Sequence, residues 1–188
     1  LVLRRQRQMC IRDSNYGEEL NPLDNQVFET MTIVKNSSYT KFKKCVFKYT
    51  DGPAIEIYGG NNILEDNYFS YIDKTVCNLS SVMTTIRLGG SNNIVKYNTF
   101  YKTGASSTLN SGNEAIIEYN NLSESGFLQS DGALIHCMVN QQPNTKIRFN
   151  WVHDTIKYGI RFDGDGEGYG GYVHHNICLL YTSPSPRD

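Results

Sequence analysis

The sequence has no long apolar segment, few cysteines and no sustained helical periodicity, and each absence narrows the possible structures. No apolar run approaches the ~20 residues that a membrane-spanning helix needs, so we expect no membrane partner. Helical periodicity is poor, and β-branched and aromatic residues occur instead in short runs between Gly and Asn. This composition is typical of many short strands joined by turns.

The two ends of the chain differ in character from the rest. Residues 4–14 read RRQRQMCIRDS, and residues 178–188 read CLLYTSPSPRD. Parts of both strings can be encoded by the complementary strands of one transposon-end DNA sequence, so both resemble translated library adapters. The alternative is a basic N-terminal arm and a Pro-rich tail. We predict that 1–14 and 178–188 are non-native segments and that 15–177 is an internal fragment of a longer natural protein.

Charge and cysteine content change once these segments are set aside. The whole chain has a formal net charge of −1 and the two segments carry +3, which leaves −4 on residues 15–177. The N-terminal Arg run is therefore no evidence for nucleic-acid binding, and we expect no nucleic-acid partner. Of the five cysteines, those in the natural part are Cys45, Cys77 and Cys137. Three cannot all pair within one chain, and we read them as free thiols.

One short pattern recurs through the natural part: an apolar residue, two variable residues, Asn, one variable residue and, in most copies, a second apolar residue. The Asn positions are Asn67, Asn98, Asn120, Asn150 and Asn176, with Cys45 at the same place in an earlier copy. Successive copies lie 22 to 31 residues apart, the range of stacked repeats. Asn tolerates left-handed backbone angles, and its amide can bond to the backbone at a corner or to Asn of the next coil. The pattern predicts a parallel β-helix.

A second short strand lies between successive copies of the Asn pattern. It reads Ile55-Glu56-Ile57, Ile86-Arg87-Leu88, Ile135-His136-Cys137 and Ile160-Arg161-Phe162. In the coil between the second and third Asn, the best candidate for this strand is Thr108-Leu109. Because side chains alternate along a strand, the four central residues should form one outward row, and none of the four is neutral.

An outward row of this composition suits an acidic sugar chain, because Arg pairs bidentately with carboxylate or sulfate groups. The alternative is a solvated sheet face on which Glu56 pairs with Arg87. A second outward row follows the leading apolar residues of the Asn pattern, and its members are Lys43, Glu65, Lys96, Glu118, Arg148 and His174. Its signs alternate over four coils, which favours pairing between neighbouring strands, so we interpret it as structural.

The Asn copies NYF, NTF, NNL and NWV, at Asn67, Asn98, Asn120 and Asn150, resemble the right-handed parallel β-helix superfamily, the pectate-lyase-like group. The strands TTIRLGG and YGIRFDG carry the same resemblance, which covers essentially residues 36–177. It implies an all-β, right-handed parallel β-helix (a solenoid), here of about six coils. It also implies a secreted or periplasmic, carbohydrate-active protein, because most relatives with known activity cleave polysaccharides by β-elimination or hydrolysis. Others are tail fibres, adhesins and epimerases.

Candidate catalytic residues follow from what a polysaccharide lyase requires. A base must remove the proton α to a uronate carboxyl, and a cation must stabilise the resulting charge. We predict His136, His153, Lys157 and Arg161 for these roles, because they fall within one or two coils of one another. The alternative for His153 is a turn pair with Asp154.

Candidate binding residues surround this group. We predict that Arg87, Glu56, Trp151 and Tyr158 bind substrate, with Trp151 pointing away from the core and aromatic rings packing on sugar CH groups. The run Asp163-Gly-Asp165-Gly-Glu167 alternates acids with Gly and can wrap a hard cation, so we predict Ca²⁺ at Asp163, Asp165 and Glu167. The alternative is a Gly-rich loop without metal.

The first functional hypothesis is therefore a monomeric polysaccharide lyase that acts on an acidic glycan. The second is a glycoside hydrolase, which needs paired carboxylates, and Asp154 with Asp163 is the pair to test. The third is a non-catalytic carbohydrate-binding or tail-fibre-like module, because a fold alone does not decide function.

Overall fold

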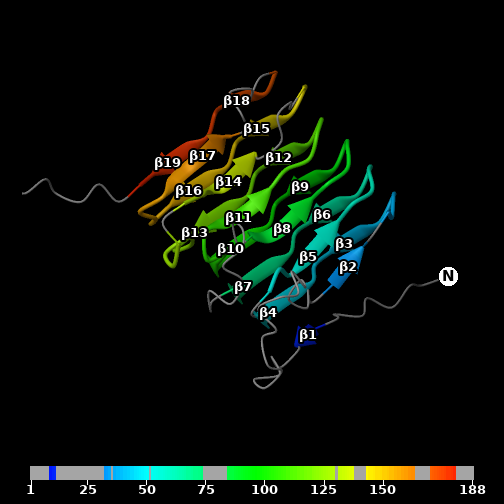
Figure 1. Cartoon of the computed structure of the whole chain (residues 1–188), viewed down its shortest axis with the longest axis horizontal. Coiled ribbons are helices and arrows are strands. Elements are labelled where there is room, and N and C mark those ends of the chain that lie inside the picture. The colour runs from blue at the N-terminus through cyan, green and yellow to red at the C-terminus, as the bar shows by residue number, and fades with distance from the viewer. Residues whose placement is uncertain are drawn as a thin grey trace, which may run out of the picture.

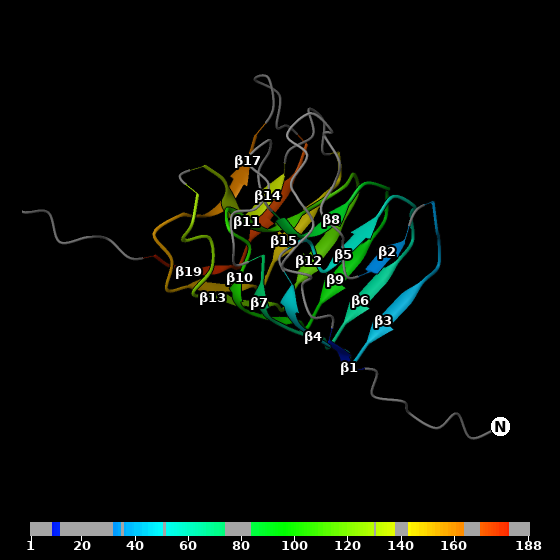
Figure 2. The same ribbon diagram turned by 60° about the horizontal axis from the view of Figure 1, so that its bottom comes forward.

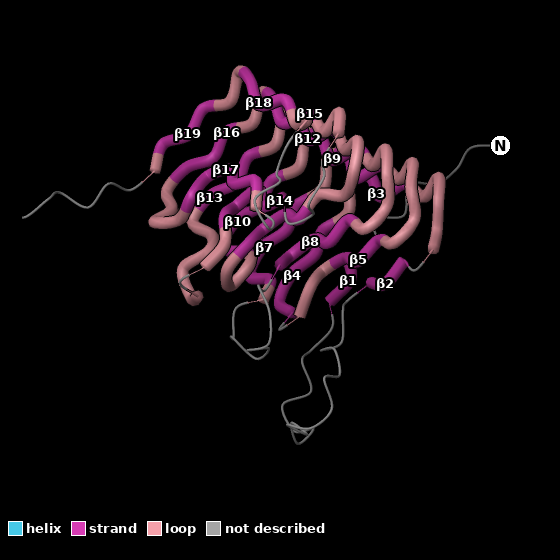
Figure 3. The backbone as a smooth tube through the Cα atoms, turned by 45° about the horizontal axis from the view of Figure 1, so that its top comes forward, coloured by secondary structure: helices cyan, strands magenta, loops and turns pink. Residues whose placement is uncertain are grey.

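The chain forms a stack of short parallel strands. The computed structural model describes residues 9–11, 32–34, 36–50, 52–73, 84–129, 131–137, 143–163 and 170–180. Within these ranges the regular structure is entirely β-strand, joined by turns (Figure 3). No helix able to cross a bilayer occurs in them. The predicted scarcity of helix is confirmed for the described residues.

The described strands form three parallel sheets, of seven, six and six strands. Sheet A contains β1 (Met9–Ile11), β4 (Val46–Thr50), β7 (Tyr68–Ile72), β10 (Thr99–Thr103), β13 (Asn121–Ser123), β16 (Trp151–His153) and β19 (Ile177–Leu179). Sheet B contains β2 (Thr32–Val34), β5 (Ile55–Ile57), β8 (Thr84–Leu88), β11 (Ser107–Asn110), β14 (Ala133–Cys137) and β17 (Tyr158–Phe162). Sheet C contains β3 (Lys41–Lys43), β6 (Ile63–Glu65), β9 (Ile94–Lys96), β12 (Ile116–Glu118), β15 (Lys146–Arg148) and β18 (Tyr172–His174).

From β3 onwards, each coil of the chain passes through sheet C, then sheet A, then sheet B, before the next coil begins. Figures 1 and 2 show the coils stacked side by side, from the blue N-terminal strands to the red C-terminal strands. The predicted parallel β-helix is confirmed. The strand expected at Thr108-Leu109 is also present, as β11, and Leu109 pairs in register with Ile86 and Ile135 on its two neighbours.

The core consists of inward-facing residues that repeat from coil to coil. On sheet A, the residues Phe47, Phe69 and Phe100 pair in register and are at most 1% exposed. Their rings stack with centroid distances of 4.7 and 4.8 Å. Full burial of one such side chain stabilises the fold by about 2–3 kcal/mol. Each coil therefore buries its apolar face against its neighbours, and not within itself.

A ladder of Asn side chains runs along the corner between sheets C and A. Its members are Asn67, Asn98, Asn120, Asn150 and Asn176. Oδ1 of Asn120 accepts hydrogen bonds from the backbone N–H of Asn98 at 2.9 Å and from Nδ2 of Asn98 at 3.0 Å. Nδ2 of Asn120 donates to the carbonyl of Val95 at 2.9 Å and to Oδ1 of Asn150 at 3.0 Å. The predicted stacking of these amides, and their bonding to the corner backbone, are confirmed.

The left-handed backbone at this corner belongs to the residue before each ladder position, and not to the Asn. The residues in this conformation are Lys44, Asp66, Tyr97, Tyr119, Phe149 and His175, with φ between 55° and 59°. The expectation that Asn takes this angle is therefore wrong. The physical reason is geometric, because the Asn amide must point along the stack to reach the next coil, so the preceding residue makes the bend.

The outward row on sheet C is in register over its whole length. Glu65 binds Lys41 at 2.7 Å and Lys43 at 2.8 Å, and Glu118 binds Arg148 at 2.8 Å. These pairs join neighbouring strands, which agrees with a structural role for the row.

Candidate functional site

The predicted outward row of sheet B exists as an in-register column. Glu56 pairs with Arg87, which pairs with Asn110, then His136, then Arg161. The fifth position, Asn110, is neutral, unlike the four positions named from the sequence. Glu56 and His136 are only 2% and 0% exposed, so the row is solvated only in part, and the alternative pairing of Glu56 with Arg87 is present.

Glu56 and Arg87 form one end of this column. Oε1 of Glu56 lies 3.5 Å from NH1 of Arg87, and the contact is an ion pair without a hydrogen bond to that oxygen. Oε2 of Glu56 accepts a hydrogen bond from the Tyr58 hydroxyl at 3.4 Å. Burial raises the pKa of Tyr58, and the neighbouring Glu56 charge adds to the increase. Glu56 is therefore a buried partner of Arg87, which is itself one-third exposed.

Arg161 lies between two carboxylates at the other end of the column. Its NH1 is 2.6 Å from Oδ1 of Asp131, and its NH2 is 2.7 Å from Oδ2 of Asp163. The Arg161 hydrogen bond lowers the pKa of Asp131, and the Gly132 N–H, which donates to the same Oδ1 at 2.7 Å, lowers it further. The pKa of Arg161 is raised in turn. The guanidinium also lies over the Tyr158 ring, 6.0 Å from its centroid.

Lys157 lies behind Asp131. Its side chain is buried, and Nζ donates to the backbone carbonyl of Asp131, which also accepts from the Ser106 hydroxyl. Burial lowers the pKa of Lys157; the Asp131 charge opposes this shift, and the Arg161 charge adds to it. The backbone N–H of Lys157 donates to Thr155 Oγ1 at 3.1 Å, which fixes the turn before β17.

His136 connects this group to the core of sheet B. Its Nε2 is 3.3 Å from Oδ2 of Asp163, and its Nδ1 is 3.1 Å from Oγ of Ser107. Burial lowers the pKa of His136, and the hydrogen bond to Asp163 partly opposes this. Three of the four predicted catalytic residues, His136, Lys157 and Arg161, therefore meet around Asp131 and Asp163. We call these five residues the Arg161 cluster.

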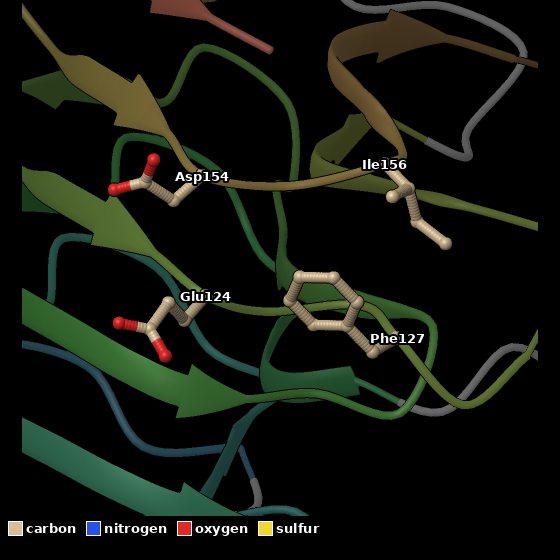
Figure 4. Close-up of a pocket in the computed structure, with 4 residues that line it drawn as sticks. All are labelled: Glu124, Phe127, Asp154 and Ile156. Atoms are coloured by element: carbon tan, nitrogen blue, oxygen red, sulfur yellow. The ribbon is translucent and has the colours of Figure 1, made fainter. Parts of the chain in front are cut away.

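Two open pockets lie near this end of the stack. One, of about 470 Å³, is lined by Glu124, Phe127, Asp154 and Ile156, and both carboxylates follow neighbouring strands of sheet A (Figure 4). The other, of about 320 Å³, is lined by Tyr158, Ile160 and Arg161 and borders the Arg161 cluster.

Comparison with known families covers most of the chain. The model of the family described as "Right handed beta helix region" matches residues 26–176. The chain belongs to the right-handed β-helix family. No curated protein and no solved structure matches it. The right-handed β-helix fold is thereby established, whereas family membership by itself specifies no reaction.

In this right-handed β-helix, His153 is not part of the Arg161 cluster. It lies on β16 of sheet A, where Nδ1 is 2.7 Å from Oδ2 of Asp154 and Nε2 is 2.9 Å from Oδ1 of Asn121. Its ring stacks on Trp151 with a centroid distance of 4.0 Å. The predicted turn pair with Asp154 is present. Trp151 points away from the core as predicted and is 46% exposed.

The predicted calcium ligands of the β-helix are only partly described. Asp163 contacts Arg161 and His136, while Asp165 and Glu167 lie outside the described residues. Within the described ranges, no group of three or more His, Cys, Asp or Glu residues could hold a metal ion. Of the cysteines predicted as thiols, Cys45 and Cys137 form no disulfide in the described part of the chain, and Cys77 lies outside it. Burial raises the pKa of Cys137 to about 12.

Sequence reasoning missed Asp131. The residue lies in the irregular segment between β13 and β14, and no strand periodicity marks it. The signal in the sequence that could have indicated a special turn here is the Gly that follows Asp131. In the structure Gly132 has φ +103°, and a Cβ there would lie 2.2 Å from Oγ of Ser106. Gly is thus required at a turn that brings the Asp131 carboxyl onto Arg161.

Proposed function

We propose that this right-handed β-helix cleaves an acidic polysaccharide by β-elimination, at the end of sheet B formed by β14 and β17. The supporting observation is the Arg161 cluster, in which a buried Lys and a partly exposed Arg lie against one loop residue, Asp131. Clusters of groups with shifted pKa values next to an open pocket are typical of functional sites.

The roles of these residues follow from the steps of the reaction. A base takes the proton α to the uronate carboxyl, the C–O bond β to that carboxyl breaks, a C=C bond forms, and the leaving oxygen takes a proton. Arg161 would pair with the substrate carboxylate and stabilise the charge that develops on it. Lys157 is the proposed base, because it lies beside Arg161 and its lowered pKa increases the fraction of neutral amine; Nζ would leave the Asp131 carbonyl to take the proton.

His136 and Arg87 have supporting roles in this proposal. His136 is fully buried and orients Asp163, so it positions the cluster and does not touch substrate. Arg87 lies three strands from Arg161 along sheet B, a distance of roughly 14 Å at the usual strand spacing. It would therefore bind an anionic group further along the same sugar chain.

A panel of uronate polysaccharides tests the proposal, with the ultraviolet absorbance of the unsaturated product as the measurement. We expect product from the wild-type chain on at least one substrate. Lys157→Ala and Arg161→Ala should each lower the rate about 100-fold or more, the usual effect of removing a base or a charge-stabilising group. Lys43→Ala, which removes an exposed cation of sheet C, should keep the rate. If the wild-type chain, shown to be folded by circular dichroism, forms no unsaturated product from any substrate, the lyase proposal is refuted.

A second candidate is glycoside hydrolysis, and the pocket in Figure 4 favours it. Glu124 and Asp154 place two carboxylates on its wall, and the exposed side chains of Phe127 and Ile156 could pack on a sugar ring. The pair first expected, Asp154 with Asp163, is less suited, because Asp163 follows a strand of sheet B whereas Asp154 follows a strand of sheet A. In this case Glu124→Gln and Asp154→Asn would abolish release of reducing ends, no unsaturated product would form, and Lys157→Ala would retain activity.

Binding without cleavage is the remaining outcome, and retention of the chain on an acidic glycan without any product would indicate it. The proposed substrate is extracellular, so we also propose a secreted or periplasmic location and a monomeric state. Calcium binding through Asp163, Asp165 and Glu167 remains a prediction, testable by calcium titration of the purified chain.

A further inference from the structure

The carboxyl group of Asp131 occupies a site that is built for an anion. Its Oδ1 lies 2.6 Å from NH1 of Arg161 and accepts the Gly132 backbone N–H at 2.7 Å. A guanidinium and a backbone N–H that converge on one oxygen form the surroundings in which proteins bind free carboxylates. The Asp131 side chain is 64% exposed, so this group can leave the site for solvent.

The backbone of Asp131 is held independently of its carboxyl. Its carbonyl oxygen accepts from the Ser106 hydroxyl and from Nζ of Lys157, both on elements of the described stack. The next residue, Gly132, is buried, and its φ of +103° suits Gly alone. Rotation of the Asp131 side chain would therefore vacate the site while the loop, the Gly132 N–H and Arg161 stay in place.

Asp163, the other carboxylate on Arg161, is less free to leave. Its Oδ2 contacts NH2 of Arg161 at 2.7 Å and Nε2 of His136 at 3.3 Å, and its side chain is 38% exposed. It would keep Arg161 oriented while NH1 is exchanged between Asp131 and another anion.

We propose that Asp131 is an internal competitor that fills the carboxylate-binding position of Arg161 until an acidic ligand displaces it. The inference depends on the proposed function for the identity of that ligand, a uronate, but not for the existence of the anion site. Asp131 is then a specificity-determining residue, because a ligand must bind Arg161 and the Gly132 N–H more strongly than a carboxylate already attached to the chain.

Acetate, the simplest carboxylate, tests the inference without any glycan. The midpoint of thermal unfolding is measured against acetate concentration, with chloride at the same ionic strength as reference, for wild type and Asp131→Ala. We expect a saturable rise in the variant, with an apparent affinity for acetate up to roughly fivefold above that of wild type. That ratio corresponds to the release of one exposed ion pair.

Asp66→Ala is the matched control. Asp66 is also exposed, carries the same charge and pairs with a cation, Lys44, at 3.7 Å, but it lies at a corner between sheets C and A. Its removal should give no acetate response beyond that of wild type. Should Asp131→Ala fail to fold, Asp131→Ser replaces it, because its hydroxyl can still accept the Gly132 N–H.

Equal acetate responses in all three chains, or no response in any, would overturn the inference. Failure of the proposed function is a different result. A saturable acetate response confined to the Asp131 variant, with no polysaccharide bound or cleaved, would support the anion site and contradict the lyase proposal. Cleavage by wild type without that acetate response would support the lyase proposal and contradict the anion site.

Discussion

Single residues carry the corners of this β-helix, and each corner divides two tasks between neighbours in sequence. At Tyr119-Asn120, the tyrosine takes the left-handed conformation, with φ 55°, and the Asn supplies the amide that joins three coils. A left-handed residue other than Gly costs roughly 1 kcal/mol. The buried amide bonds offset this cost at every coil, because the backbone groups they satisfy would otherwise be buried without partners.

Asn120→Ala should lower the free energy of unfolding by about 3 kcal/mol. The change leaves the backbone N–H of Asn98 and the carbonyl of Val95 without the partners they have now, and Asn120 is only 2% exposed. Urea unfolding followed by circular dichroism measures the effect. Asn113→Ala is the control, because Asn113 is an exposed loop residue, and it should change stability by less than about 0.5 kcal/mol.

Asn120→Asp separates the two functions of the amide. The carboxylate keeps an acceptor for Asn98 but removes the donor to Val95 and introduces a buried charge. We expect it to be at least as destabilising as Ala near neutral pH. Full stability of either variant at position 120 would contradict a supporting role for the ladder.

At the scale of strands, the outward row of sheet C couples neighbouring coils through charge. Hydrogen bonds from Lys41, and then from Lys43, lower the pKa of Glu65 to about 2 from its ordinary 4.5. A carboxyl whose pKa is depressed by folding contributes stability above its unfolded pKa. That contribution is lost as pH falls from about 4.5 to about 2.

Unfolding free energy should therefore decrease between pH 5 and pH 2 more steeply in wild type than in Glu65→Gln, and the two curves should converge toward pH 2. Denaturant titrations at a series of pH values, at low salt because the pairs are exposed, provide the measurement. Glu114→Gln is the comparison, since no ion pair involves Glu114 in the described part of the chain. Parallel curves for wild type and Glu65→Gln would show that the row makes no contribution.

The strands could be predicted from sequence because each one repeats the same inward and outward pattern. The Asn pattern located the corner between sheets C and A, and the apolar residue three positions earlier located the strands of sheet C. A second amide corner escaped notice: Asn62 and Asn93 are buried, and Nδ2 of Asn62 donates to Oδ1 of Asn93 at 3.1 Å. It spans only two of the coils, too few copies to stand out as a period.

The candidate site was less predictable than the strands, for a physical reason. Arg161 and His136 were placed by strand alternation, which is local. Asp131 and Lys157 reach the same point from irregular segments, and only the three-dimensional path of those segments brings them together. The prediction for His153 failed for the opposite reason. His153 is close to Lys157 in sequence, but it lies on sheet A, whereas the Arg161 cluster lies on sheet B.

For the molecule as a whole, the stacking that builds the fold also leaves sheet edges at its ends. Residues of segments 1–14 and 178–188 lie at these edges: β1 pairs with β4, and Cys178 and Leu179 of β19 pair with β16. An unpaired parallel edge accepts almost any extended segment, because the backbone supplies the hydrogen bonds. Pairing in sheet A is thus compatible with the prediction that these segments are non-native.

A chain of residues 15–177 tests that prediction. We expect it to keep the β-type circular dichroism spectrum and cooperative unfolding, because the core columns and the Asn ladder lie within it. Its thermal midpoint should fall by only a few degrees, the effect of losing a few edge pairings and the contacts of Cys178. Exposure of the β4 and β16 edges should also increase self-association with concentration, measurable by analytical ultracentrifugation. If the 15–177 chain is unfolded, the terminal residues are an integral part of the stack. The reason is that coils which bury their apolar faces against one another do not need a segment that only covers a sheet edge.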